Sequence, residues 1–185
     1  MSQVYLVRHS ESAVDPSRPP EQWDLTVRGQ ELAARLAASQ EWKRMSAVAC
    51  SEEPKAKMTA TLIAEHWHKP LVPDQRFREV TRPFSDTTRE FEEMVAEYLK
   101  GRALPAWEQI SEAANRFQSG LADLRKKHRG DVAVVSHGTI MAVYLSRSLG
   151  IRFSGREWSK IAMPDVCVID VEAGRILRNW GQTRF

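Results

Sequence analysis

The sequence of 185 residues contains only two cysteines, no long apolar run and almost no excess of either charge. Cys50 and Cys167 each lie in an apolar, strand-like context, which favours buried structural thiols over a disulfide framework or a metal-binding motif. No stretch approaches the roughly 18 apolar residues that cross a membrane, and the first residues lack the basic and apolar regions of a signal peptide. We therefore expect a cytoplasmic protein that does not bind a membrane.

The charge of the chain is mild, with a formal net charge of +3 at pH 7. Its densest basic run, at 126–129, is typical of the solvated C-terminal end of a helix, where cations are stabilised. Nucleic-acid binding would need a coherent basic face, which the sequence does not show. The small positive excess instead favours an anionic small molecule as the ligand. The sequence leaves the oligomeric state open.

What the sequence does have is an apolar first strand that ends abruptly in polar residues. The apolar residues at 4–7 are followed directly by Arg8 and His9. In open α/β sheets, ligands bind just past the carboxyl ends of the strands. Arginine offers a rigid fork of donors for phosphate or carboxylate, and histidine can act as nucleophile, acid or base. Taken alone, the pair could equally be an ordinary surface pair at a strand end.

Two further strands are expected to end in the same way. The apolar segment 45–50 leads into a helix whose first turn contains Lys55, although a helix N-terminus disfavours a cation. The clearest central strand, at 131–135, leads through His137 and Gly138 into another helix. A turn of small residues at a helix N-terminus presents free N–H groups, which favour phosphate.

The alternation of strands and helices predicts a three-layer α/β/α fold with a mostly parallel central sheet. The length suits one domain with a substantial core, and no repeat or linker interrupts it, so we expect a single domain over 1–185. Residues 81–104 are the least sheet-like and are expected to form a helical rim, starting at a capping box of Thr87 and Glu90. The other expected elements are helices at 27–39, 51–67, 105–128 and 140–149 and extended segments at 71–73, 76–80, 165–171 and 175–177.

The three strand ends should bring Arg8, His9, Lys55 and His137 to one edge of the sheet, with Glu79 on a neighbouring segment. One histidine could attack, the cations could hold an anion, and the glutamate could serve as acid or base. Metal-free phosphoryl transfer requires such a set, because most of its catalysis is positioning and charge stabilisation.

Two other uses of these residues compete with phosphoryl transfer. A zinc site could use the two histidines, but it would need a third good ligand and no crowd of cations. A serine hydrolase could use Ser136, but the sequence lacks the glycine two residues earlier that a nucleophile elbow needs. Both are the weaker interpretations, and we expect no metal at this edge.

Five segments in order resemble the motifs of the histidine phosphatase superfamily, also called phosphoglycerate mutase-like. They are LVRHSES at 6–12, DLTVRG at 24–29, SEEPKAKMTA at 51–60, FRE at 77–79 and VVSHG at 134–138. The corresponding family patterns are L-V-R-H-G-E-[ST], D-x-x-L-[ST]-x-x-G, S-D-L-x-R-A-x-Q-T-A, L-x-E and V-x-H-G. Each motif is weak by itself, but their order and spacing agree over nearly the whole chain.

The resemblance implies a phosphatase that needs no metal or organic cofactor and acts on a phosphorylated small molecule. His9 would be the nucleophile and form a phosphohistidine, while Arg8, Lys55 and His137 would bind the phosphoryl oxygens. Glu79 would protonate the leaving group and then activate water. Three further candidates for phosphate binding are Ser10, Gly138 and Asp15, the last at a position where relatives often have asparagine.

Several departures from the family pattern leave alternatives open. Ser10 replaces a glycine, Lys55 replaces an arginine and so lacks its bidentate fork, and Glu53 and Met58 replace an apolar residue and a glutamine. These changes motivate a second hypothesis, a weak or inactive phosphate-binding protein of the same fold. A mutase is a third, but mutases of this family look longer, with an insertion over the site.

The substrate cannot be identified from the sequence. Several arginines flank the expected site along the chain and suggest that the organic part of the substrate is anionic. They are Arg18, Arg76, Arg78, Arg82 and Arg89. We expect 81–104 and the proline-rich loop at 15–23 to form the rim that selects the substrate.

Overall fold

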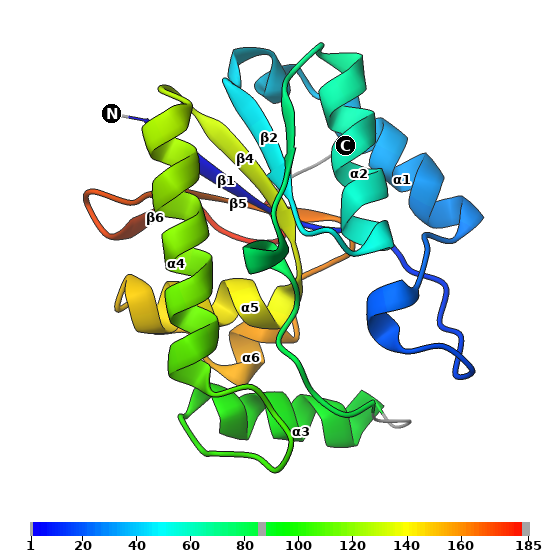
Figure 1. Cartoon of the computed structure of the whole chain (residues 1–185), viewed down its shortest axis with the longest axis vertical. Helices are drawn as coiled ribbons and strands as arrows, with labels where there is room; N and C mark the ends of the chain where they lie inside the picture. The colour runs from blue at the N-terminus through cyan, green and yellow to red at the C-terminus, as the bar shows by residue number, and fades with distance from the viewer. Residues whose placement is uncertain (1, 85–87, 183–185) are drawn as a thin grey trace.

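The computed structural model describes residues 2–84 and 88–182 and contains a six-stranded sheet with helices on both faces (Figure 1). In chain order the strands are β1 (Val4–Arg8), β2 (Ala47–Cys50), β3 (Leu71–Pro73), β4 (Val132–Ser136), β5 (Asp165–Asp170) and β6 (Arg175–Arg178). They lie in the order β3-β2-β4-β1-β5-β6. The first four are mutually parallel, whereas β5 pairs antiparallel with β1 and β6 antiparallel with β5. The α/β fold expected from the sequence is confirmed.

Helices form a layer on each side of the sheet. They are α1 (Val27–Ala37), α2 (Pro54–His66), α3 (Thr88–Leu99), α4 (Ile110–Lys127), α5 (Gly138–Val143) and α6 (Gly155–Trp158). The layer on one face contains α1 and α2, and the layer on the other contains α4 and α5, while α3 lies beyond α5 and α6 in Figure 1. Among the described helices, none is long and apolar enough to cross a membrane.

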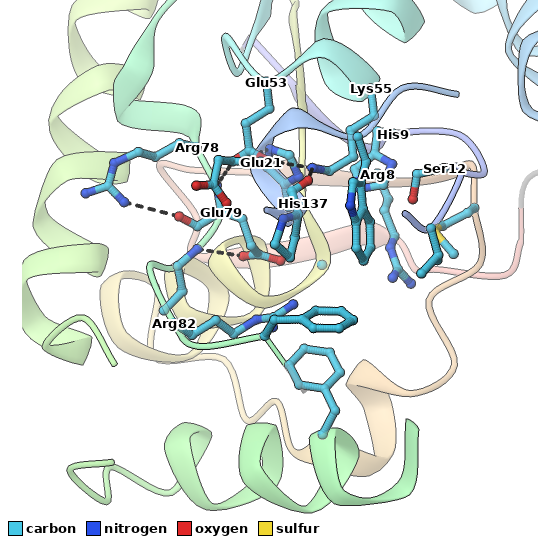
Figure 2. A pocket seen from close by; sticks show the side chains of 18 of the residues that line it. Arg8, His9, Ser12, Glu21, Glu53, Lys55, Arg78, Glu79, Arg82 and His137 are labelled. Carbon is cyan, nitrogen blue, oxygen red and sulfur yellow. Dashed lines mark hydrogen bonds and ion pairs between the residues drawn. The ribbon is translucent and has the colours of Figure 1, made fainter. Parts of the chain in front are cut away.

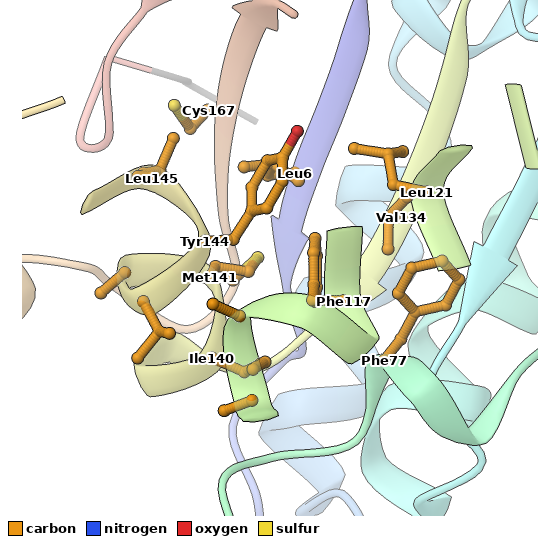
Figure 3. Packing of buried hydrophobic residues seen from close by; sticks show 14 of the residues in the cluster. Leu6, Phe77, Phe117, Leu121, Val134, Ile140, Met141, Tyr144, Leu145 and Cys167 are labelled. Atoms are coloured by element: carbon orange, nitrogen blue, oxygen red, sulfur yellow. The ribbon is translucent and has the colours of Figure 1, made fainter. Parts of the chain in front are cut away.

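The two faces of the sheet are buried by alternate residues of each strand. Leu6 and Val134 face α4 and α5, where they meet Phe117 and Tyr144 (Figure 3). Their neighbours Val7 and Val135 face α1 and α2 instead. Side chains of a strand alternate between faces, so a strand that is buried on both sides must be apolar throughout. This explains the continuous apolar runs that led to the prediction of β1 and β4.

The parallel strands bring their carboxyl ends to one edge. In the register of the sheet, Arg8 at the end of β1 lies opposite Ser136 at the end of β4, and Cys50 at the end of β2 lies opposite Val135. Residues that follow these three strands therefore emerge side by side. The sheet positions the candidate site in this way.

The long helix expected from residue 105 begins five residues later, at Ile110. Ala106 has a φ of 60°, a left-handed conformation that interrupts a helix. The amide of Glu108 then donates to the carbonyl of Thr81 rather than to a helical partner. The expectation failed because long-range contacts of this segment outweigh its local helical pattern.

Smaller differences occur near three other elements. Residues 76–80, expected to be extended, begin with a 3-10 turn at Gln75–Phe77, because the carboxylate of Asp74 caps it by accepting from the amide of Arg76. The N-cap of helix α2 is Glu53 rather than the expected Ser51. The capping box expected at Thr87 lies outside the described residues.

Candidate active site

A pocket of about 590 Å³ opens where β1, β2 and β4 end (Figure 2). Six of the site residues expected from the sequence line it. They are Arg8, His9, Lys55, Glu79, His137 and Gly138. The ends of β1, β2 and β4 lead into five of these residues, and Glu79 joins them from the segment after the turn at Gln75–Phe77. The sequence predicted this meeting from the alternation of strands and helices.

His9 is held as a neutral ring with one nitrogen unprotonated. Its Nδ1 lies 2.7 Å from the carbonyl oxygen of Ser10, which can only accept, so Nδ1 carries the proton and Nε2 has a free lone pair. Burial lowers the pKa of His9 well below 6.5, and the neighbouring His137, Arg8 and Lys55 lower it further. A neutral imidazole with a free Nε2 is a competent nucleophile at neutral pH.

His137 is the second ring at the base of the pocket, 5.0 Å from the His9 ring between centroids. Burial lowers the pKa of His137 to about 3, and the positive charges of Lys55 and Arg8 act in the same direction against the carboxylate of Glu79. Neither nitrogen of the ring makes a hydrogen bond, although Nε2 lies 3.3 Å from Oε1 of Glu53. A neutral ring of this kind can donate one hydrogen bond to an anion.

Arg8 enters the pocket from the end of β1. Its Nη1 donates to the carbonyl of Ile161, whereas its Nε has no partner. Burial lowers the pKa of Arg8, while the carboxylates of Glu79 and Asp165 oppose the shift. A guanidinium nevertheless stays protonated in proteins, so Arg8 brings a full positive charge to the pocket.

Glu79 is fixed against the start of α5. Its Oε1 accepts from the amides of Val80 (2.9 Å) and Ile140 (2.8 Å), and its Oε2 accepts from the amide of Thr139 (3.2 Å). The first amides of a helix have no partner within the helix, and a carboxylate can satisfy them. The capping contacts hold the carboxylate in the wall of the pocket beside His137.

Arg116 of α4 holds the segment that contains Glu79. Its guanidinium donates to the carbonyls of Arg76 (2.7 Å), Arg78 (2.8 Å) and Glu79 (3.0 Å), and it pairs with Glu108 at 2.7 Å. Burial raises the pKa of Glu108, but hydrogen bonds and the charge of Arg116 outweigh it, so the pKa is lowered. The sequence contained no signal for this role, because Arg116 lies far from the motifs.

Lys55 is already paired inside the pocket. Its Nζ donates to Oε2 of Glu53 and to the carbonyl of Pro20, both at 2.6 Å. The other oxygen of Glu53 accepts from the amide of Glu79 at 2.8 Å. The side chains of Lys55 and Glu53 are only 7% and 10% exposed. The carboxylate of Glu53 therefore cancels the charge that the motif was expected to offer to phosphate.

Two expected phosphate ligands do not line the pocket. Ser10 is fully buried, and its hydroxyl donates to the carbonyl of Gly29 at 2.6 Å. Among the described residues other than glycine, a positive φ occurs only at His68 and Ala106, so Ser10 fits its position without strain. Asp15 accepts from the amide and the hydroxyl of Ser17 and lies outside the pocket lining.

The flanking arginines separate into two groups. Arg76 pairs with Asp74 and Asp123, Arg89 with Glu93 and Arg18 with Asp24, all outside the pocket lining. Arg78 and Arg82 do line the pocket, and Arg78 pairs with Glu108. The guanidinium of Arg82 lies 3.9 Å from the centre of the Phe91 ring. Only part of the cationic rim suggested by the sequence is therefore formed.

Aromatic side chains complete the outer part of the pocket. The rings of Trp23, from the loop at 15–23, and Phe84, from the segment at 81–104, meet edge to face at 5.6 Å. Phe91 of α3 packs edge to face against Trp158 of α6 at 5.4 Å. Both segments expected to form the rim thus contribute side chains to this pocket.

Comparison with known proteins places the chain in a family. Residues 4–183 match the family model of the histidine phosphatase superfamily (branch 1). The chain belongs to this superfamily. It is 28% identical over 164 residues to a probable phosphoglycerate mutase GpmB of Escherichia coli, covering 82% of this chain and 76% of the relative. The corresponding protein of Yersinia enterocolitica is 29% identical over the same length.

Several solved structures share the fold. YhfR of Bacillus stearothermophilus superposes with a TM-score of 0.77 at 20% identity, covering 100% of this chain and 98% of that one. A phosphoserine phosphatase mutant of Entamoeba histolytica, solved with phosphoserine, gives 0.75 at 18% identity with the same coverage. A mycobacterial glucosyl-3-phosphoglycerate phosphatase, solved with vanadate, gives 0.72 at 17% identity, covering 92% and 93%. At these identities the likeness establishes the fold alone.

Two pocket residues of this member of the superfamily were not assigned a role from the sequence. Glu53 did give a signal, because it occupies an apolar position of the family motif, but its contact with Lys55 depends on how the side chain turns at the start of α2. Trp158 gave none, because it lies in a four-residue helix without a motif.

Proposed function

We propose that the protein is a phosphomonoesterase that acts through a phosphohistidine at His9. The observation that carries this proposal is the contact between Nδ1 of His9 and the carbonyl of Ser10. It leaves Nε2 unprotonated in a pocket that also contains the charge of Arg8. A nucleophile beside a fixed cation is what attack on a phosphate ester requires.

The reaction would proceed in two displacements at phosphorus. In the first, the lone pair of His9 Nε2 attacks, the bond from phosphorus to the ester oxygen breaks, and that oxygen takes a proton from Glu79 in its acid form. In the second, the Glu79 carboxylate takes a proton from water, the water oxygen attacks phosphorus, and the bond to Nε2 breaks. Arg8 and His137 would stabilise the charge on the phosphoryl oxygens, and the carbonyl of Ser10 would stabilise the positive ring.

The substrate would be a phosphorylated small molecule, with no metal ion taking part. Within the described residues, no group of three or more His, Cys, Asp or Glu side chains lies close enough together to hold a metal. A chelator such as EDTA should accordingly leave the rate unchanged. Rescue of a chelated sample by a divalent cation would contradict this part of the proposal.

The test is hydrolysis of an aryl phosphate by the purified protein and by His9→Ala. We expect metal-free turnover by the wild type and a loss of about 1,000-fold or more in His9→Ala, since removal of a nucleophile costs at least this much. Brief reaction with 32P-labelled substrate followed by denaturation should trap label on the wild type only. Equal rates for the two proteins would refute the proposal.

The contact between Glu53 and Lys55 favours a second candidate, a phosphate-binding protein without turnover. It weakens the positive charge available to a phosphoryl group. The discriminating result would be saturable binding of inorganic phosphate together with no labelled intermediate.

The relatives named as probable phosphoglycerate mutases suggest one further assay, the exchange of phosphate between positions of phosphoglycerate.

A further inference from the structure

Besides the ring nitrogens of His137 and Nε of Arg82, two buried N–H groups of described pocket residues have no hydrogen-bond partner. They are Nε of Arg8 and Nε1 of Trp158. Trp158 is only 7% exposed. A buried indole N–H usually finds an acceptor, because leaving it unpaired costs free energy comparable to a lost hydrogen bond. An unpaired donor at a pocket wall therefore indicates an acceptor that arrives with the ligand.

Both donors border one small space beside Gly138. A side-chain carbon placed on Gly138 would lie 3.2 Å from Nε1 of Trp158 and 3.4 Å from Nε of Arg8. Glycine keeps this space open, next to the ring of His137 that precedes it in the chain. Both nitrogens therefore lie on the same side of Gly138, where no side chain separates them from a ligand in the pocket.

The indole of Trp158 is held in place from several directions. Helix α6 begins with a reciprocal capping box between Ser154 and Glu157. Gly155 packs so closely on α3 that an added side-chain carbon would lie 2.5 Å from Cβ of Ala96. The ring of Phe91 packs edge to face against the indole. The unpaired N–H therefore belongs to a fixed side chain rather than to a loose one.

Lys55, by contrast, already has two acceptors. Glu53 and the carbonyl of Pro20 take two of its three N–H donors, and the carboxylate neutralises its charge. A phosphoryl group next to Lys55 would meet the negative charge of Glu53. The two donors beside Gly138, in contrast, have no acceptor within the protein.

We propose that Nε1 of Trp158 and Nε of Arg8 together bind an oxygen of the phosphoryl group. The tetrahedral oxyanion is thereby held beside Gly138, and Trp158 takes over a contact that the family motif assigns to the position of Lys55. This inference rests on the proposed function, since it concerns how the same pocket holds a phosphate ester.

The decisive variant is Trp158→Phe, which keeps an aromatic ring and removes the N–H. The matched control is Trp180→Phe, because Trp180 is 9% exposed, has an equally unpaired Nε1 and does not line the pocket. Titration calorimetry with inorganic phosphate should show affinity about tenfold weaker or more for Trp158→Phe, the usual effect of one hydrogen bond to a charged group. Trp180→Phe should change the affinity less than twofold.

A second measurement needs no folded variant. The chain has six tryptophans, and nuclear magnetic resonance of 15N-labelled wild-type protein reports each indole N–H separately. Saturation with inorganic phosphate should move the Trp158 indole signal downfield by more than the other five, because a new hydrogen bond forms there. A signal that stays still at saturation overturns the inference.

The outcomes separate the two proposals. If Trp158→Phe binds phosphate as the wild type does, the inference fails, while turnover of an aryl phosphate still upholds the proposed function. If the wild type neither binds phosphate nor hydrolyses an ester, both fail. Loss of phosphate affinity in Trp158→Phe, with a melting temperature close to that of Trp180→Phe, supports the inference.

Discussion

Two clusters of residues line the same pocket and differ in whether their hydrogen-bond donors are already paired within the protein. The Lys55 cluster (Lys55 and Glu53) lies at the start of α2, just after β2, and its two charges neutralise each other. The Arg8 cluster consists of Arg8 at the end of β1, Trp158 in α6 and Gly138 at the start of α5. Two of its N–H groups, Nε of Arg8 and Nε1 of Trp158, are buried without an acceptor. A cation in a motif is thus available to a ligand only if no neighbouring carboxylate has already paired with it.

The largest effect should come from breaking the Arg8 cluster. Arg8→Lys keeps the positive charge but removes Nε and the planar fork. We expect kcat/KM for an aryl phosphate to fall about 100-fold, as for the loss of one fixed donor to a developing anion. Steady-state kinetics of both proteins measures the fall. A decrease below threefold would show that this cluster does not hold the phosphoryl group.

The sequence predicted the Arg8 cluster only in part. Arg8 and Gly138 follow apolar runs, and parallel strands bring their carboxyl ends together, so their meeting follows from a local pattern plus a general rule. Trp158 comes from a segment with no periodic pattern. Its helix is placed by tertiary contacts, among them the close packing of Gly155 on α3.

For the Lys55 cluster, the sequence predicted where the residue lies but not which contacts it makes. The position of Lys55 near a strand end was predicted correctly, but its availability was not. Whether Lys55 is neutralised depends on the direction of the Glu53 side chain. Two residues of opposite charge that lie two positions apart in the sequence could equally point away from each other. Likewise, Arg116 supports the Glu79 segment from α4 through three carbonyls, which residue spacing along the chain does not reveal.

The second prediction concerns the ring of His137, which is buried in its neutral form in the same pocket. It should make the stability of the protein depend on pH. The pKa of His137 is lowered from 6.5 to about 3 by burial, so below pH 6.5 the unfolded chain binds a proton there that the folded chain does not. The contribution of the neutral His137 ring to stability is therefore fully present above pH 6.5 and is lost as the pH falls below that value. Urea unfolding should show a loss from His137 of about 2 kcal/mol at pH 5.

His137→Gln removes this titration and should flatten the decline between pH 7 and pH 5 by that amount. His66→Gln is the control, because His66 is exposed and should leave the slope as it is. If His137→Gln and the wild type lose equal stability over this range, the ring is not held neutral in the folded protein.

The smallest effect should come from releasing the Lys55 cluster. Glu53→Gln keeps the size of the side chain and removes its charge, so Lys55 regains an uncompensated positive charge in the pocket. We expect inorganic phosphate to bind about three- to tenfold more tightly, the effect of one partly screened charge nearby. Glu52→Gln is the matched control, since it removes the same charge from the exposed neighbouring residue and should change the affinity less than twofold. Weaker binding by Glu53→Gln would mean that Glu53 helps to hold the anion, and the contrast between the two clusters would then be wrong.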